Sequence, residues 1–136
     1  MQFDTKIVVV LRDDLEVWQK ANVAAFVVSG IAGTDPATVG EPYVDGSGVR
    51  YLPMFRQPLL VYAADGAGLR RAYERARARD VELAIYTREL FSTGHDEANR
   101  AAVAAVASGE LDLVGIAFRA ERKTADKVLD RLRPHP

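Results

Sequence analysis

The sequence predicts an α/β fold, a three-layer α/β/α sandwich with helices on both faces of a mainly parallel sheet. Short, continuous apolar runs recur along the chain, and such runs are typical of strands that are buried on both faces. Segments with helical spacing of apolar residues separate them, and this alternation favours the sandwich. The 136 residues contain no repeat and no linker. We therefore expect one domain over residues 1–136.

The first strand and the first helix are the clearest elements. Residues 5–12 form an apolar run rich in Val and Ile, which Asp13 ends. Residues 16–32 then carry apolar side chains at helical spacing, and Asp14 is expected as the N-cap. Trp18 lies in the first turn of this helix, where it is either an exposed contact surface or part of the core.

Residues 34–58 have a different composition, with four prolines and the turn sequence DGSG. Tyr43–Val44 and Val49–Tyr51 flank that turn, which predicts a short β-hairpin. An ordered excursion of this length is often a place where binding groups are found.

Three further strands and three further helices complete the prediction. The strands are expected at residues 59–63, 81–87 and 111–118, and the helices at residues 67–79, 96–107 and 123–132. Helix 67–79 exposes several arginines. Helix 96–107 is nearly all alanine on one side, and Thr93 is expected to cap it.

Composition excludes several classes of function. The net charge is -1, so no global field attracts nucleic acid or an acidic membrane. The chain has no cysteine and only two histidines, so we expect no metal and no cofactor. The N-terminal stretch lacks the pattern of a signal peptide, and no apolar run approaches the ~20 residues that cross a bilayer. We therefore expect a cytoplasmic protein without a membrane partner.

Three stretches resemble the type II peptidyl-tRNA hydrolases of archaea and eukaryotes. These are KIVVVLRDDLEVWQKANVAA, QPLLVYAADGAGLRRAYERARARDVELAIYTRE and LDLVGIAFRAERKTADKVLDRLR. The resemblance implies a four-stranded mixed sheet whose last strand is antiparallel, with the third strand ending beside the first. The hairpin of residues 39–53 and helix 96–107 look like additions whose role stays open. The sequence most resembles an uncharacterised bacterial family that shares this fold and has Asn before Val-Ala-Ala.

Departures from the hydrolase pattern imply altered chemistry. The hydrolases have a catalytic Lys directly before Val-Ala-Ala, where this chain has Asn22. Lys20 lies two residues earlier, about 200° around a helix of ~3.6 residues per turn, so it points elsewhere. Phe26 and Ser29 stand at the Gln and His positions, and Arg88 stands near the position of the catalytic Asp. We therefore expect that peptidyl-tRNA hydrolysis has been lost.

A candidate ligand site lies at the C-terminal ends of strands one and three, where open α/β sheets place ligands. Its candidate residues are Lys20, Asn22, Tyr86, Arg88 and His95. A helix N-terminus and the Asn22 amide suit an anion or a carbonyl group, and Arg88 offers a bidentate contact. A neutral His95 is a possible general base. The alternatives are structural: Asn22 bonds the turn backbone, Arg88 pairs with Asp14 or Glu89, and Lys20 and His95 are solvated.

The function that these residues predict is binding of a small anionic or carbonyl-bearing ligand. The alternative is a peptidyl-tRNA hydrolase-related RNA-binding or hydrolase role, which the arginines of helix 67–79 support if they share a face with Lys20. We expect no nucleic-acid partner. We expect a homodimer, because of the alanine-rich helix and of exposed Tyr43, Tyr51 and Phe55. The identity of the ligand and whether the protein is an enzyme stay open.

Overall fold

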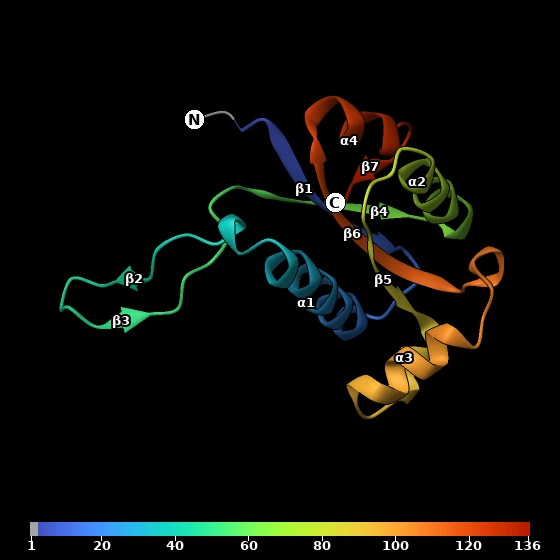
Figure 1. The fold of residues 1–136 in the computed structure, drawn as a ribbon, viewed down its shortest axis with the longest axis horizontal. Coiled ribbons are helices and arrows are strands. Elements are labelled where there is room, and N and C mark those ends of the chain that lie inside the picture. The colour runs from blue at the N-terminus through green and yellow to red at the C-terminus, as the bar shows by residue number, and fades with distance from the viewer. Residues whose placement is uncertain (1–2) are drawn as a thin grey trace.

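A computed structural model describes residues 3–136 (Figure 1). It has a mixed α/β architecture around a five-stranded sheet in the order β5-β6-β1-β4-β7. The sheet strands are β1 (Thr5–Arg12), β4 (Leu59–Ala64), β5 (Ala84–Thr87), β6 (Leu113–Glu121) and β7 (Arg133–Pro134). The α-helices are α1 (Val17–Thr34), α2 (Gly66–Ala78), α3 (Asp96–Ala104) and α4 (Arg122–Val128), and short 3-10 helices are η1 (Pro36–Thr38), η2 (Arg88–Ser92) and η3 (Ser108–Glu110).

Strand β1 lies at the centre of the sheet because its apolar residues can be buried on both sides. Its neighbours are β4, which is parallel to it, and β6, which is antiparallel. Val8 and Val10 face one layer of the core, and Ile7 and Val9 face the other. Side chains of successive residues in a strand alternate between the two faces of the sheet, so a continuous run of Val and Ile supplies apolar side chains to both core layers. The predicted burial of Val9 is confirmed.

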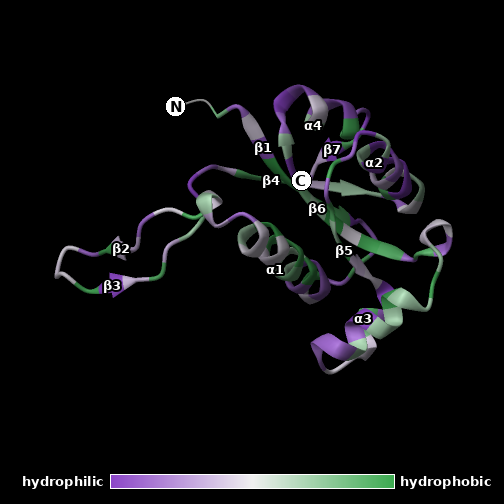
Figure 2. Ribbon diagram, viewed as in Figure 1, coloured by the Kyte–Doolittle hydropathy of each residue, from purple (hydrophilic) through white to green (hydrophobic). Residues whose placement is uncertain are grey.

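Helices cover the two faces of this sheet. Helix α1 packs on the face of Ile7 and Val9, and α2 and α4 pack on the face of Val8 and Val10. Figure 2 shows the hydrophobic residues along β6, which crosses between these helices. Gly115 of β6 lets α1 approach closely, because a Cβ atom there would overlap the Val23 side chain.

The sheet differs from the predicted one in two ways. First, it has a fifth strand, β7, whose Arg133 and Pro134 pair with the edge of β4. Second, β6 lies between β1 and β5, so β5 is not the neighbour of β1 that the resemblance implied. The antiparallel direction of β6 and the mixed sheet are confirmed.

Helix ends also differ from the expectation, and α3 ends at Ala104 instead of residue 107. Glu16, not Asp14, is the N-cap of α1, and its N–H donates to Gln19 Oε1 at 2.9 Å. His95, not Thr93, is the N-cap of α3, and its Nδ1 accepts from the Ala98 N–H at 3.2 Å. Helix α4 ends at Val128, and the chain then turns back through Arg131, whose φ of 69 is in the left-handed region. That turn brings the last residues alongside β4.

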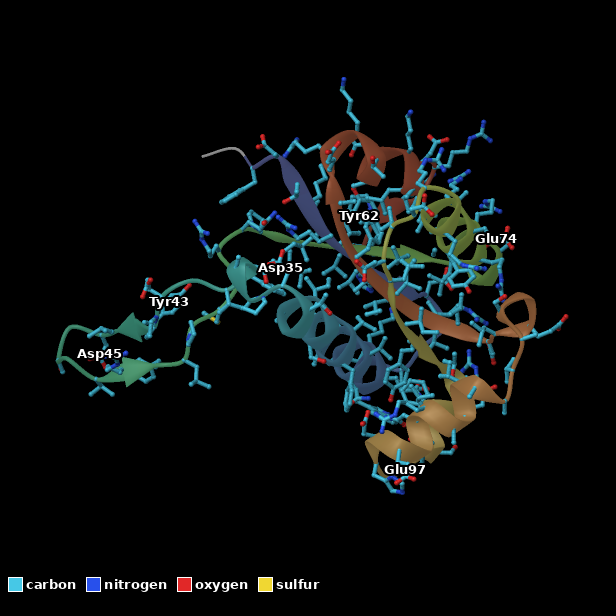
Figure 3. All side chains as sticks on the ribbon, in the orientation of Figure 1. Asp35, Tyr43, Asp45, Tyr62, Glu74 and Glu97 are labelled. Carbon is cyan, nitrogen blue, oxygen red and sulfur yellow. The ribbon has the colours of Figure 1, made fainter. Side chains whose placement is uncertain are left out.

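The predicted hairpin is confirmed and forms an arm that projects away from the sheet (Figures 1 and 3). We define the arm as residues 39–55, with β2 (Tyr43–Val44) and β3 (Arg50–Tyr51) as its strands. Tyr43 pairs with Tyr51, as the sequence predicts. The Asp45 carboxylate holds the turn by accepting from the backbone N–H groups of residues 47 and 49 and from the Tyr51 hydroxyl at 2.7 Å.

Candidate functional site

A hydrogen bond between Asn22 and Tyr86 links α1 to β5. Asn22 Nδ2 donates to the Tyr86 hydroxyl at 3.0 Å. Tyr86 belongs to the core layer under α1, and its neighbour in β5, Ile85, packs on the opposite layer. Strand alternation therefore aims the phenol at the helix. Asn22 meets it one and a half turns into α1, which begins at Val17.

These two side chains line a cavity of about 390 Å³ between α1, the end of β5 and the segment η2–α3. Its walls are mainly apolar. Trp18 and Phe26 lie one helical turn before and after Asn22, at the i−4 and i+4 positions, and so share its side of α1. The other lining side chains are those of Leu90, Phe91, Thr93, His95, Asp96 and Asn99, together with Gly94.

Aromatic contacts join the walls of the cavity into one packed unit. The Trp18 and Phe91 ring centroids are 5.8 Å apart at 70°, and those of Phe26 and Tyr86 are 5.8 Å apart at 69°. Tyr86 and Phe91 have their centroids 5.1 Å apart. Edge-to-face arrangements of this kind are favoured by the charge distribution of the rings. The two polar groups of Asn22 and Tyr86 thus lie among aromatic rings.

The Tyr86 hydroxyl stays protonated at neutral pH. Burial raises the pKa of this phenol above its usual value of 10.0, and the hydrogen bond from Asn22 offsets part of that effect. Because the hydroxyl oxygen accepts from Asn22, its own O–H remains a donor, and the Asn22 carbonyl oxygen remains an acceptor. The pair therefore offers one donor and one acceptor side by side.

His95 contributes a donor rather than a base. Its Nδ1 accepts from the Ala98 N–H, so the neutral ring carries its proton on Nε2. A base at Nε2 would need the other tautomer and would give up the cap of α3. The geometry thus does not favour the general-base role that the sequence left open for His95.

Arg88 and Lys20 do not line this cavity. Arg88 Nε lies 3.2 Å from Asp112, and its NH2 lies 3.7 Å from Asp14. Arg12 lies 3.4 Å from each of the same two carboxylates, so four charges form one network at the ends of the strands. Pairing with Asp14 is the structural alternative that the sequence left open for Arg88.

Lys20 turns to the other end of the chain, where its Nζ is 3.1 Å from His135 Nε2. Its direction differs from that of Asn22, as the helical spacing predicts. Of the five candidates, the structure therefore brings Asn22, Tyr86 and His95 together and leaves Arg88 and Lys20 elsewhere.

The arginines of α2 do not share a face with Lys20. Helix α2 covers the layer of Val8 and Val10, and α1 covers the opposite one. Several of these arginines also serve the fold: Arg70 donates to the carbonyls of Ser108 and Leu111 at 2.9 and 2.6 Å, and Arg75 donates to that of Asp130 at 2.8 Å.

A larger hollow of about 550 Å³ lies at the opposite end of the sheet, by Thr5, Gln57 and Arg122. Its polar groups already have partners. Gln57 donates to the Thr5 carbonyl at 3.0 Å, and Arg122 donates to that of Phe3 at 3.2 Å. It also lies by the N-terminal end of β1, away from the edge where open α/β sheets bind ligands.

Sequence reasoning missed the contribution of the segment after β5. Phe91, Thr93 and Asn99 line the cavity, and the Thr93 hydroxyl bonds the Asn99 side chain. The only local signal for them is a pair of aromatic residues at the fourth position on either side of Asn22, which indicates an apolar neighbour.

Within residues 3–136, no three His, Asp or Glu side chains are grouped as metal ligands, and no helix has the length and apolar character needed to cross a membrane.

The fold is that of a mixed α/β protein with a five-stranded sheet and a projecting hairpin arm. A family model described as protein of unknown function (DUF2000) matches residues 5–136, and the chain belongs to that family. The expected membership of an uncharacterised family is thus confirmed. A solved structure of a protein of unknown function from Agrobacterium tumefaciens is similar, with 45% sequence identity and a TM-score of 0.96 over 99% of this chain and 100% of that chain. Among curated proteins, none matches the sequence.

Proposed function

We propose that this protein binds a small uncharged molecule with a carbonyl or carboxamide group in the cavity between α1, β5 and η2–α3. The observation that carries the proposal is the Asn22–Tyr86 pair, which lies among aromatic walls. Cavities of a few hundred cubic ångströms with apolar walls and few polar groups are typical of small-ligand sites.

The chemistry of the pair selects the ligand class. A carboxamide has an acceptor oxygen for the Tyr86 O–H and a donor N–H for the Asn22 oxygen. Trp18, Phe26 and Phe91 suit a flat apolar body. An anion has weaker support, since the charged group among the described lining residues is the carboxylate of Asp96. The proposal therefore keeps the carbonyl-bearing ligand of the sequence prediction and sets the anionic one aside.

The order of the elements along the chain and the direction of β6 support a second part of the proposal, that the fold is of the type II peptidyl-tRNA hydrolase kind. The quoted sequence stretches fall on β1–α1, β4–α2–β5 and β6–α4, and β6 is antiparallel as that resemblance implies. A hydrolase or RNA-binding role has less support. The residue at the catalytic Lys position is Asn22, which is bonded to Tyr86, and the α2 arginines lie on the far side of the sheet.

Trp18 is the one tryptophan of the chain, and it gives a direct assay. Benzamide, benzoate and toluene share a ring and differ in the polar group, so each is titrated while Trp18 emission is measured. We expect saturable binding for benzamide and weaker binding for the other two. Removing one hydrogen bond in Tyr86→Phe should weaken benzamide binding by roughly tenfold.

Asn22→Ala should weaken benzamide in the same way, and Arg88→Ala is the matched control that should leave it unchanged. The proposal fails if benzamide gives no saturable response. It also fails if Tyr86→Phe and Asn22→Ala bind benzamide as well as the unaltered protein does.

A further inference from the structure

The arm exposes apolar side chains that a folded protein normally covers. Every residue from Tyr43 to Leu52 is exposed, and Val44 and Leu52 are 60% and 85% exposed. An isolated two-stranded hairpin is marginally stable in water because it has no third surface to pack on. The arm nevertheless has a defined turn held by Asp45 and paired tyrosines. This combination indicates a partner surface.

A second apolar surface lies on the outer side of α1. Val17, Trp18 and Phe26 are 85%, 62% and 54% exposed, and the alanines at positions 21 and 25, also exposed, lie between them. We call these five residues the α1 stripe. Trp18 and Phe26 also line the cavity, so the stripe borders its mouth.

We propose that two copies of this chain form a two-fold dimer in which the arm of each copy lies on the α1 stripe of the other. The arm leaves the body at the C-terminal end of α1 through η1 (Figure 1). A two-fold axis close to η1 places the C-terminal ends of the two α1 helices near one another and each arm alongside the α1 helix of the other copy. The arm of one copy then runs along the partner's stripe towards Val17 and Trp18.

The lengths of the two surfaces agree with this arrangement. The 18 residues of α1 span about 27 Å at ~1.5 Å per residue. Each leg of the arm, from the Val39–Phe55 bridge to the turn at Gly46, spans roughly 25 Å at ~3.3 Å per residue. An arm is thus long enough to cover most of a partner's stripe.

The exposed area is also what a stable dimer needs. Six arm side chains are at least half exposed: Tyr43, Val44, Val49, Tyr51, Leu52 and Met54. Side chains alternate between the faces of a hairpin, so Val44, Leu52 and Met54 share one face and the other three share the opposite one. At roughly 100 Å² each, one face offers about 300 Å², and the large residues of the α1 stripe add about 300 Å². The total of about 600 Å² per copy, or ~1,200 Å² for the dimer, is at the lower end of the range for specific interfaces.

A second copy fits better than an unrelated protein because one chain carries both surfaces. In a two-fold dimer each surface is used once per copy, and the assembly closes without leaving a free arm. The similarity to the Agrobacterium tumefaciens protein covers 99% of this chain, so the arm belongs to the structure that the two proteins share. The dimer stands whether or not the cavity binds a carboxamide, since the arm and the stripe are separate observations.

The consequence for the site is that each cavity is completed by the other copy. The arm crosses the rim formed by Trp18 and Phe26 and brings apolar side chains of the partner copy to the mouth. Ligand entry then depends on arm position as well as on Asn22 and Tyr86.

Sedimentation equilibrium over a micromolar concentration series tests the dimer, with Trp18 emission and iodide quenching measured on the same samples. The expected mass is twice the 14.9 kDa of the chain, with Trp18 shielded from iodide in the dimer. Val44→Asp and Leu52→Asp place a charge on the arm and should weaken the dimer by at least roughly tenfold while exposing Trp18. Ala67→Asp adds the same charge on exposed α2, on the other face of the sheet, and is the matched control.

Circular dichroism verifies that the variants are folded, which their exposed positions favour. A monomer at every concentration would overturn the proposal. A dimer that Val44→Asp and Leu52→Asp leave intact would overturn the role of the arm. A dimer in which Trp18 stays open to iodide would overturn the placement on the α1 stripe.

Discussion

Gly115→Ala tests whether α1 is held against β6 by direct contact. A Cβ atom at position 115 would lie well under 3.0 Å from Val23 Cγ1, a separation that carbon atoms do not adopt. Val23 cannot simply rotate away, because a β-branched side chain in a helix has one strongly preferred χ1 rotamer. Gly115 lies in β6 and Val23 lies in α1, and both positions are buried, so the clash has to move α1. We expect a loss of about 1–3 kcal/mol in the free energy of unfolding.

A double-mutant cycle makes this reasoning quantitative. Val23→Ala alone leaves a small cavity and should cost about 1–3 kcal/mol. In the double variant the new methyl group occupies the space that Val23 leaves, so the combined loss should be smaller than the sum by at least ~1 kcal/mol. Guanidinium unfolding followed by circular dichroism measures all four proteins. Gly33→Ala is the control, because no atom lies within 4 Å of its added Cβ. Additive losses, or a Gly115→Ala protein as stable as the parent, would refute the contact.

Three further predictions concern the core, the lost chemistry and the cavity. Val9→Ala should lower the free energy of unfolding by about 1–3 kcal/mol, since Val9 is fully buried in the central strand; unchanged denaturant unfolding would contradict this. The protein should not cleave diacetyl-lysyl-tRNA, and turnover above a no-enzyme control that Asn22→Ala abolishes would show otherwise. Burial raises the pKa of Tyr86 above 10.0, so its contribution to stability is complete below pH 10.0 and is lost as the pH rises further. Tyr86→Phe lacks this loss, so urea unfolding from pH 8 to 11 should show the parent losing stability relative to the variant; parallel curves would argue against a buried neutral phenol.

Local signals were sufficient for the elements whose neighbours are near in sequence. The apolar run of β1 matches Thr5–Arg12 at both ends, and the DGSG turn gives the hairpin. Such elements depend on hydrophobic periodicity and turn chemistry, and a few consecutive residues determine both. Helix caps were less predictable, because both Asp14 and Glu16, and both Thr93 and His95, are plausible caps within one turn.

The sheet order could not be derived in the same way. Strand β6 is inserted between β1 and β5 by pairings such as Thr5 with Glu121 and Tyr86 with Gly115, and nothing local selects them. Strand β7 contains Arg133 and Pro134, which carry no strand pattern. A proline is tolerated there because an edge strand needs only one set of hydrogen bonds.

In the candidate site, too, the sequence identified single residues but not their distant partners. Asn22 was identified from its position before Val-Ala-Ala, and its partner Tyr86 is 64 residues away. Arg88 was expected in the cavity. Its long side chain instead extends to a carboxylate with which it forms an ion pair. That carboxylate is on Asp112, which directly precedes β6, and the sequence gave this residue no role.

The position of β6 determines when this protein can fold during synthesis. Strand β6 is the internal strand that bridges β1 and β5, yet its residues 113–121 follow both of those strands in the chain. While the ribosome is still adding residues before 113, β1 has one open edge and β5 has no strand beside it. Pairings more than one hundred residues apart, such as Thr5 with Glu121, close late and slowly. A nascent chain without β6 thus presents an unpaired valine-rich edge, the kind of surface that chaperones protect from aggregation.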